Sequence, residues 1–251
     1  MPFLYTLKNV FKIRQNGAVV FELHVPEFHA ARGEFIAVVG PSGCGKSTFL
    51  DLLALVLCPS DDSVSSFLFS CSRDAQTEYD IKNLWEKGKE NEISMLRRRH
   101  IGYVLQTGGL LPFFSVRMNI ELACRLKGLN NVSRRIEKIA NLLGIEDLLD
   151  KKPQYVSGGE RQRTAIARAL IHEPAVVLAD EPTAAVDHFR ALIILKEFTQ
   201  LAKEKGTGII LATHNYNLVK EIADQTIRFN ITLSVDKGKR KTISTLTTFG
   251  V

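Results

Sequence analysis

The sequence lacks a long hydrophobic run. Its longest apolar stretch, FLDLLALVLC at residues 49–58, is about half as long as the ~20 residues that a membrane-spanning helix needs. The opening residues, MPFLYTLKNVFKIRQ, lack the basic segment and the following apolar segment of a secretory signal peptide. We therefore expect a cytoplasmic protein.

Cysteine is scarce. The 251 residues include four cysteines, and no two of them form a C-x-x-C pair or show the spacing of metal ligands. We expect reduced thiols that serve packing, and a disulfide or metal site is the less favoured alternative. The four are Cys44, Cys58, Cys71 and Cys124.

Neither sign of charge is in large excess. The 33 basic and 27 acidic residues give a net charge of +6, which permits contact with nucleic acid or anionic lipid without requiring either. Two basic clusters, RRRH at 97–100 and KGKRK at 237–241, fit solvated faces better than binding patches. We expect no nucleic-acid partner. With 45% hydrophobic and 24% charged residues and no internal repeat, the composition is that of an ordinary globular protein.

Three short apolar runs predict buried parallel strands. They are FIAVV at 35–39, AVVLA at 175–179 and GIILAT at 208–213. Each is rich in β-branched residues and is followed by polar or glycine-containing residues, as strands buried on both faces are. Helical patterns follow the first two runs, so we expect an α/β core.

The flanking segments have other patterns. Residues 4–13 and 17–25 alternate between apolar and polar side chains, which predicts an antiparallel edge sheet. Residues 115–150 carry apolar positions at helical spacing and predict a helical region. Residues 59–95 are polar, rich in Ser and Asp at first, and predict no particular element.

A glycine-rich stretch follows the first predicted strand. GPSGCGKST fits G-x-x-x-x-G-K-[ST] and lies between a strand and a helical run, where this pattern forms a phosphate-binding loop. A glycine-rich turn with a chance lysine is the alternative. Lys46 is expected to reach the β- and γ-phosphates of a nucleotide, and the Ser47 hydroxyl to bind Mg²⁺. The loop residues are Gly40, Pro41, Ser42, Gly43, Cys44, Gly45, Lys46, Ser47 and Thr48.

Polar residues end the other two predicted strands. Neighbouring side chains in a strand point in opposite directions, so Asp180 and Glu181 are expected to have separate roles. Asp180 is placed to hold Mg²⁺ through water, and Glu181 to act as general base on the attacking water. An acidic turn that ends the strand is the alternative. His214 is expected to contact the γ-phosphate or orient the water, and a packed or solvated histidine is the alternative.

A second helix start, VSGGERQR at 156–163, is also suited to an anion. Ser157 and Glu160 have the S-x-x-E spacing of a capping box, and the glycines Gly158 and Gly159 leave the backbone N–H groups accessible. A simple helix cap is the alternative, and both can hold at once, since capping builds the helix whose dipole binds the anion.

Together these motifs resemble the ATP-binding-cassette (ABC) ATPases. The phosphate loop, VSGGERQR, VVLADEPT at 176–183 and ATHN at 212–215 occur in the order and approximate spacing of that family. The resemblance covers about residues 4–230, and it is closest to the lipoprotein-release, macrolide-efflux and cell-division group. It implies one ABC ATPase domain over 1–251: a phosphate-loop core with a mainly parallel sheet, an antiparallel β edge subdomain, and a helical subdomain at roughly 107–172. Within that domain, 59–95 is a variable polar segment.

The resemblance also assigns roles to individual residues. Gln106 matches a glutamine that contacts Mg²⁺, and Asp187 an aspartate that crosses the dimer interface. Arg14 occupies the place of a tyrosine that stacks on adenine, with Phe11 or Ile13 as alternatives. Residues 108–114 would line a groove for a helix of a membrane subunit, or form ordinary core. The implied catalytic set is Lys46, Gln106, Glu181 and His214, and the implied metal ligands are Ser47, Gln106 and Asp180.

The implied function is ATP hydrolysis coupled to transport. Two subunits, in the simplest case identical, would bury two Mg·ATP, with Ser157, Gly158 and Gly159 binding the γ-phosphate held by the other subunit. A separate membrane permease would carry an export or a lipoprotein or lipid extraction activity, and would hold the subunit at the cytoplasmic face. One alternative is signalling through a membrane partner to a cell-wall hydrolase. Another is a soluble ABC ATPase outside transport, although long coiled coils, zinc insertions and a second cassette are all missing.

Overall fold

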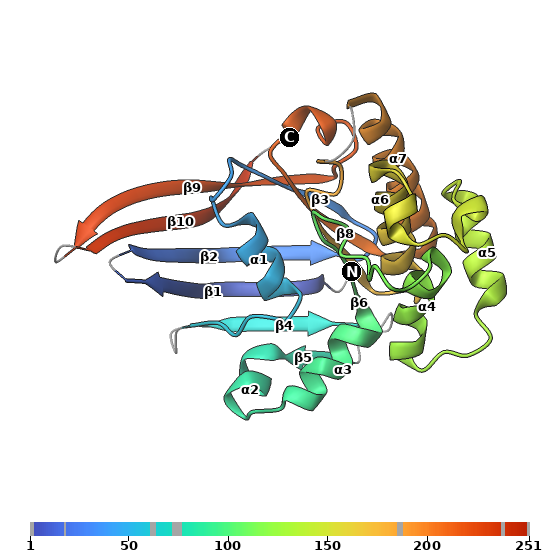
Figure 1. The fold of residues 1–251 in the computed structure, drawn as a ribbon. Coiled ribbons are helices and arrows are strands. Elements are labelled where there is room, and N and C mark those ends of the chain that lie inside the picture. The colour runs from blue at the N-terminus through green and yellow to red at the C-terminus, as the bar shows by residue number, and fades with distance from the viewer. Residues whose placement is uncertain are drawn as a thin grey trace.

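A ten-stranded sheet runs through the whole molecule in the computed structural model, which describes residues 3–17, 19–60, 64–71, 77–184, 188–236 and 239–249 (Figure 1). The strand order is β5-β4-β1-β2-β10-β9-β3-β8-β7-β6. The strands are β1 (Phe3–Asn16), β2 (Val19–Ala31), β3 (Phe35–Val39), β4 (Ser66–Ser70), β5 (Glu78–Asp80), β6 (Ile101–Val104), β7 (Val176–Asp180), β8 (Gly208–Thr213), β9 (Gln225–Asp236) and β10 (Lys239–Phe249).

The helices lie on both faces of this sheet and at its β6 end (Figure 1). Short 3-10 turns occur at Glu146–Leu148, Pro153–Tyr155 and Tyr216–Leu218. None of the described helices is both long and apolar enough to cross a membrane. The helices are α1 (Lys46–Leu53), α2 (Ile81–Glu86), α3 (Glu90–His100), α4 (Val116–Lys127), α5 (Ser133–Leu142), α6 (Gly158–Leu170) and α7 (His188–Lys205).

The core of the sheet is parallel. Strands β9, β3, β8, β7 and β6 pair in parallel, and every residue of β3 and β8 is buried. Alternate side chains face opposite layers: Ala37 and Val39 pack in the hydrophobic cluster that includes α4–α7, whereas Ile36 and Val38 pack in the cluster that includes α1. The predicted strands at 35–39 and 208–213 therefore have the predicted bounds, and the third begins one residue later than predicted.

The rest of the sheet is mostly antiparallel. Strand β1 pairs antiparallel with β2 and β4, and β4 with β5, while β10 joins the two halves by pairing with β2 and β9. The α/β fold class, with a mostly parallel core and an antiparallel edge, is confirmed. Residues 59–95, for which no element is predicted, contribute β4, β5, α2 and part of α3. The β9–β10 hairpin lies beyond the elements that the sequence predicts.

Helices α4, α5 and α6 fall within the predicted helical subdomain at 107–172, and its separation from the core stays a prediction. Local sequence explains where α4 begins and ends: the Ser115 hydroxyl accepts a hydrogen bond from Met118 N, and Gly128 ends the helix with a φ of 85°. The buried Asn119 of α4 holds the preceding loop, because its Oδ1 accepts from Leu111 N at 2.7 Å and its Nδ2 donates to Leu111 O at 3.1 Å.

Strand β6 approaches α6 closely at a glycine. A Cβ atom on Gly102 would lie 2.3 Å from the carbonyl oxygen of Ala169, which is backbone and has little room to move. We predict that Gly102→Ala lowers the free energy of unfolding by about 1–3 kcal/mol, the usual cost of overpacking a tight contact. Urea unfolding measures this. The control is Gly208→Ala, also in a strand, where the nearest atom to the new Cβ would be the tip of the Leu4 side chain at 3.2 Å. An equal loss of unfolding free energy in both variants would contradict the prediction.

Candidate active site

The predicted phosphate loop connects β3 to α1. Gly43 and Gly45 have positive φ angles of 79° and 105°, which glycine adopts without steric cost. Gly45 is the N-cap of α1 and makes no side-chain capping bond, so the first N–H groups of α1 are available to an anion. Two distant residues support the loop: a Cβ on Gly45 would lie 2.9 Å from Cζ of Phe21, and the buried Ser244 hydroxyl donates to the Cys44 carbonyl.

Lys46, Glu181 and His214 form a connected row at the ends of three strands. Lys46 Nζ donates to Gly40 O at 2.8 Å and Pro41 O at 3.1 Å, and it lies 3.6 Å from Glu181 Oε1. The other carboxylate oxygen of Glu181 lies 3.0 Å from His214 Nδ1. Because β3, β8 and β7 are neighbours in the sheet, residues that follow these strands meet at one edge.

Glu181 has a strained backbone. Its φ of 46° lies in the left-handed region, which costs a non-glycine residue about 1–3 kcal/mol. The bond from Glu181 N to Ala212 O, at 2.9 Å, holds this conformation. The Glu181 carboxylate then lies beside Lys46. Strain of this kind is typical of functional sites.

Asp180, the last residue of β7, interacts with the phosphate loop separately. Burial raises the pKa of the Asp180 carboxyl above its ordinary value, and the neighbouring Ser47 hydroxyl opposes that rise. Asp180 and Glu181 thus contact different groups, as the alternation of strand side chains predicts.

A pocket of about 280 Å³ opens beside the loop. Arg14 lines it, whereas Phe11 and Ile13 do not, because they lie on the other face of β1; the Phe11 ring stacks on His24 at 4.2 Å. Sequence reasoning missed Phe21, which also lines the pocket. Phe21 pairs directly with Arg14 across the β1–β2 ladder, so both side chains point to the same face. The lining residues are Arg14, Phe21, Gly43, Gly45, Lys46, Ser47 and Thr48.

Gln106 lies in an exposed turn directly after β6, which is next to β7 in the sheet. The turn is clamped to α6, because Arg168 donates from Nη2 to Gly108 O at 2.7 Å and from Nη1 to Gly109 O at 2.8 Å. Sequence reasoning missed Arg168, since no local pattern shows that an arginine of α6 reaches this turn. Asp187 lies outside the described residues.

The second helix start is a capping box. Ser157 Oγ accepts from Glu160 N at 3.3 Å, and Glu160 Oε2 accepts from Ser157 N at 2.6 Å, so the predicted cap forms at the start of α6. This bonding keeps the pKa of the Glu160 carboxyl below its ordinary value. Ser157 is exposed, and Ser157, Gly158 and Gly159 do not line the phosphate-loop pocket. The same chain therefore presents two helix starts whose N–H groups are suited to an anion, and only the first of them lines the phosphate-loop pocket.

Comparison with known proteins identifies the family. A sequence profile described as ABC transporter matches residues 23–184. The chain belongs to the ABC transporter family. Its relatives include the uncharacterized ABC transporter ATP-binding protein YknY of Bacillus subtilis (strain 168), 35% identical over 225 residues that cover 88% of this chain and 90% of YknY. The lipoprotein-releasing system ATP-binding protein LolD of Ehrlichia ruminantium (strain Gardel) is 39% identical over 201 residues, covering 79% and 82% respectively.

A solved structure agrees with the sequence relatives. A dimeric post-hydrolysis state of the ATP-binding cassette MJ0796, bound to ADP and Pi, matches with a TM-score of 0.73 and 27% identity over 89% of this chain and 93% of that chain. The present ABC chain is accordingly an ATP-binding ATPase, and the row of Lys46, Glu181 and His214 lies where its nucleotide chemistry is expected.

The ABC ATPase has a donor set that fits Mg²⁺. Ser47 and Asp180 present oxygen atoms beside the phosphate loop, and Mg²⁺ prefers oxygen ligands, keeps several waters and binds substrate phosphates. The described part of the chain has no cluster of three or more His, Cys, Asp or Glu side chains that could hold a metal ion. Nucleotide oxygens and water would therefore complete the coordination.

The role of Phe21, the lining residue that sequence reasoning missed, can be tested. We predict that Phe21→Ala weakens ATP, ADP and AMP alike by roughly 10-fold, because base–aromatic stacking is worth about 1–3 kcal/mol. Tripolyphosphate, which has no base, should bind unchanged; calorimetry measures all four. Phe11→Ala is the matched control, since its ring lies on the opposite face of the same ladder. A loss of tripolyphosphate binding would instead mean that Phe21 acts by supporting Gly45.

Proposed function

We propose that two copies of this ABC ATPase close head to tail around two Mg·ATP and thereby drive a separate membrane permease. The single observation that carries the proposal is that the capped helix start at Ser157 does not line the phosphate-loop pocket of its own chain. A capped helix start with accessible N–H groups can bind the γ-phosphate of ATP held by a second chain. The matching MJ0796 cassette is described as dimeric, which supports this arrangement.

Hydrolysis follows from the geometry around Glu181. Its carboxylate accepts a proton from a water molecule as the water oxygen bonds to the γ-phosphorus, and the bond to the ADP oxygen breaks. His214, 3.0 Å from Glu181 Oε2, orients the carboxylate or the water. Lys46 binds the β- and γ-phosphate oxygens. Mg²⁺, held by Ser47, Asp180 and Gln106 with water, would neutralise charge on those oxygens.

The names of the relatives support a transport partner. LolD is named for a lipoprotein-releasing system, and this likeness favours export or extraction of lipoprotein or lipid over other transport. We place the subunit at the cytoplasmic face of the membrane, held there by its permease. Co-purification of the chain with an integral membrane protein tests this part of the proposal.

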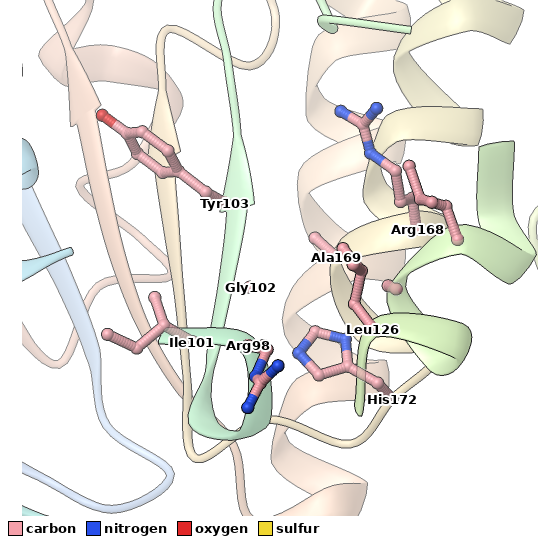
Figure 2. A pocket seen from close by; sticks show the side chains of 10 residues that line it. Arg98, Ile101, Gly102, Tyr103, Leu126, Arg168, Ala169 and His172 are labelled. Atoms are coloured by element: carbon pink, nitrogen blue, oxygen red, sulfur yellow. The ribbon is translucent and has the colours of Figure 1, made fainter. Parts of the chain in front are cut away.

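A second hollow suits the permease contact. This pocket of about 240 Å³ lies between β6, α4 and α6, with apolar walls that include Ile101 and Leu126 (Figure 2). In the view, Arg98 and His172 lie at its lower end, and Tyr103 and Arg168 at its upper end. Residues 108–114 do not line it, although Phe113 is 64% exposed on the surface.

Residues that line this second pocket are linked by contacts to the nucleotide pocket and to the turn at Gln106. Tyr103 donates to Asp51 Oδ1 at 3.0 Å, and Asp51 lies 3.8 Å from Arg14 in the nucleotide pocket. Arg168 clamps the turn that follows Gln106. A segment of the permease seated here would therefore act on the nucleotide site through these intervening residues.

A mixture of two inactive variants tests whether each ATP site is formed by two chains. Lys46→Ala disables the phosphate loop, and Gly158→Asp places a carboxylate against the incoming γ-phosphate while suiting the first turn of α6. Each variant alone should lose most hydrolysis. An equal mixture should recover about a quarter of wild-type activity, because about half of randomly paired dimers have one intact site of two.

The matched control is a mixture of Lys46→Ala with a double variant that carries both substitutions. No site is intact in any of its dimers, so activity should stay at background. If the first mixture also stays at background while each variant folds normally, the sites are formed within single chains and the head-to-tail dimer is wrong.

A further inference from the structure

Arg14 presents a cationic side chain to the nucleotide pocket from β1. It stands directly opposite Phe21 in the β1–β2 ladder, and both residues line the pocket beside the phosphate loop. A guanidinium can stack on the flat face of a nucleotide base, because its charge is spread over a plane. The Arg14 side chain is 50% exposed, so it loses rotamer entropy when a ligand fixes it. A neighbour that orients the guanidinium in advance lowers this cost.

Asp51, on α1, is such a neighbour. Its Oδ2 lies 3.8 Å from Arg14 Nη2, in the one ion pair that the described part of the chain gives to Arg14. The N–H groups of a guanidinium lie in its plane, so a carboxylate approaches the edge and leaves the flat faces available for stacking. A separation of 3.8 Å is longer than a hydrogen bond, so Asp51 steers the guanidinium by charge.

Asp51 does not stabilise its own helix through the helix dipole. It lies in the last turn of α1, which ends at Leu53, and a negative charge near a helix C-terminus is unfavourable. It follows Ser47 by four residues, so the two side chains lie on one face of α1, and Ser47 lines the nucleotide pocket. The position of Asp51 is therefore explained by what its carboxylate contacts.

Tyr103 holds the Asp51 carboxylate in place. Its hydroxyl donates to Asp51 Oδ1 at 3.0 Å, so one carboxylate oxygen accepts from Tyr103 and the other faces Arg14. Figure 2 shows the Tyr103 side chain on the side of β6 that points away from Ala169. Burial, with the charges of Asp51 and Asp180, raises the pKa of Tyr103 well above its ordinary value, so the phenol keeps its proton at neutral pH and remains a donor.

We propose that Asp51, held by Tyr103, is a positioning residue for the nucleotide base, because it orients the Arg14 guanidinium to stack on that base. This rests on the proposed function, since it takes the base of bound ATP to lie in the pocket that Arg14 and Phe21 line. Orienting the cation before the nucleotide arrives reduces the entropy lost on binding. The effect acts on the base alone, so it strengthens the binding of nucleotides and leaves the binding of a bare phosphate chain as it is.

Calorimetry with Mg·ADP and with Mg·tripolyphosphate, which has no base, tests this role. Asp51→Asn keeps the size of the side chain and an acceptor oxygen for Tyr103, and it removes the charge that faces Arg14. We expect ADP affinity to fall about two- to fivefold, the worth of a partly exposed ion pair, and tripolyphosphate affinity to stay equal or to rise. Loss of a negative charge near the site by itself favours any anionic ligand, so a general electrostatic effect has the opposite sign.

A double-mutant cycle shows whether Asp51 acts through Arg14. Arg14→Gln alone should weaken ADP at least as much as Asp51→Asn does, and adding Asp51→Asn to it should change ADP affinity by less than about 1.5-fold. Tyr103→Phe, which removes only the hydroxyl, should weaken ADP and spare tripolyphosphate. Asp150→Asn is the matched control, because Asp150 also lies 3.8 Å from an arginine, Arg117, but outside the nucleotide pocket, and it should bind ADP as the wild type does.

Three results would overturn the proposal. They are unchanged ADP affinity in Asp51→Asn or Arg14→Gln, an equal loss of tripolyphosphate in Asp51→Asn, and a full loss from Asp51→Asn in the Arg14→Gln background. The second result would assign Asp51 to the phosphate or metal part of the site, beside Asp180. Hydrolysis and ATP-dependent dimerisation are read separately on every variant, so this failure is distinguishable from a failure of the proposed function.

Discussion

Glu181→Gln is expected to bind ATP, to accumulate as a nucleotide-bound dimer and to lose most hydrolysis. Glutamine keeps the size and the acceptor oxygen of the side chain, so contact with Lys46 is retained, but it cannot accept the proton of the attacking water. Loss of a general base costs about 10²–10⁴ in rate. Since the γ-phosphate is then preserved, the two subunits stay joined through it. Size-exclusion chromatography with Mg·ATP and a phosphate-release assay measure both effects.

Glu121→Gln provides the control for this experiment. Glu121 lies on α4, pairs with Arg125 at 3.0 Å and does not line the nucleotide pocket, so its loss should leave hydrolysis and dimerisation as in the wild type. If Glu181→Gln stays monomeric with ATP and hydrolyses normally, Glu181 is not the general base and the γ-phosphate does not join the two subunits.

The sequence predicts those parts of the site whose geometry is local. Asp180 and His214 stand at the end of or directly after a short apolar run, and Lys46 begins the helix that follows a third run through the phosphate loop; an α/β fold brings such strand ends together. The capping box at Ser157 is likewise contained within four residues. Motif spacing alone is enough for these positions, because neighbouring backbone determines where each side chain points.

Contacts between distant segments were not predictable in the same way. Phe21 reaches the nucleotide pocket only because the β1–β2 register pairs it with Arg14, and a shift of one residue would turn it to the other face. Ser244 bonds to Cys44 across a separation of 200 residues. Arg168 reaches the turn after Gln106 through the close approach of β6 and α6 that Gly102 permits. Each of these depends on tertiary packing that no short motif encodes.

The strained backbone of Glu181 is a further feature that the sequence does not predict, because it depends on a distant segment. Alternation along β7 correctly separates its contacts from those of Asp180, yet the left-handed turn that brings its carboxylate within 3.6 Å of Lys46 depends on a bond to Ala212 in β8. The motif predicts which residue stands here, and the bond to the neighbouring strand fixes where its backbone lies. The roles assigned to these residues remain predictions for the variants to test.

Lys46→Met is expected to lose at least about 100-fold in ATP affinity. Lys46 is 6% exposed as a residue, and its ammonium is bonded to the carbonyls of Gly40 and Pro41. Methionine keeps the length and apolar stem of lysine and removes that ammonium. Removing one partner of a buried charge pair costs about 2–5 kcal/mol. The ammonium contacts the β- and γ-phosphates in the expected complex, so ATP and ADP should weaken strongly and AMP little. Calorimetry with the three nucleotides measures the difference.

The relative losses of affinity for ATP, ADP and AMP distinguish the role of Lys46 from that of Phe21. Phe21→Ala is expected to weaken all three nucleotides equally, because the base is common to them, whereas Lys46→Met acts through phosphates that AMP lacks. A Lys46→Met protein that loses AMP as strongly as ATP would indicate a collapsed loop, since Lys46 also bonds to the loop carbonyls. Unchanged ATP affinity would contradict the phosphate-loop assignment itself, because no other described lysine or arginine lining this pocket except Arg14 could supply the charge.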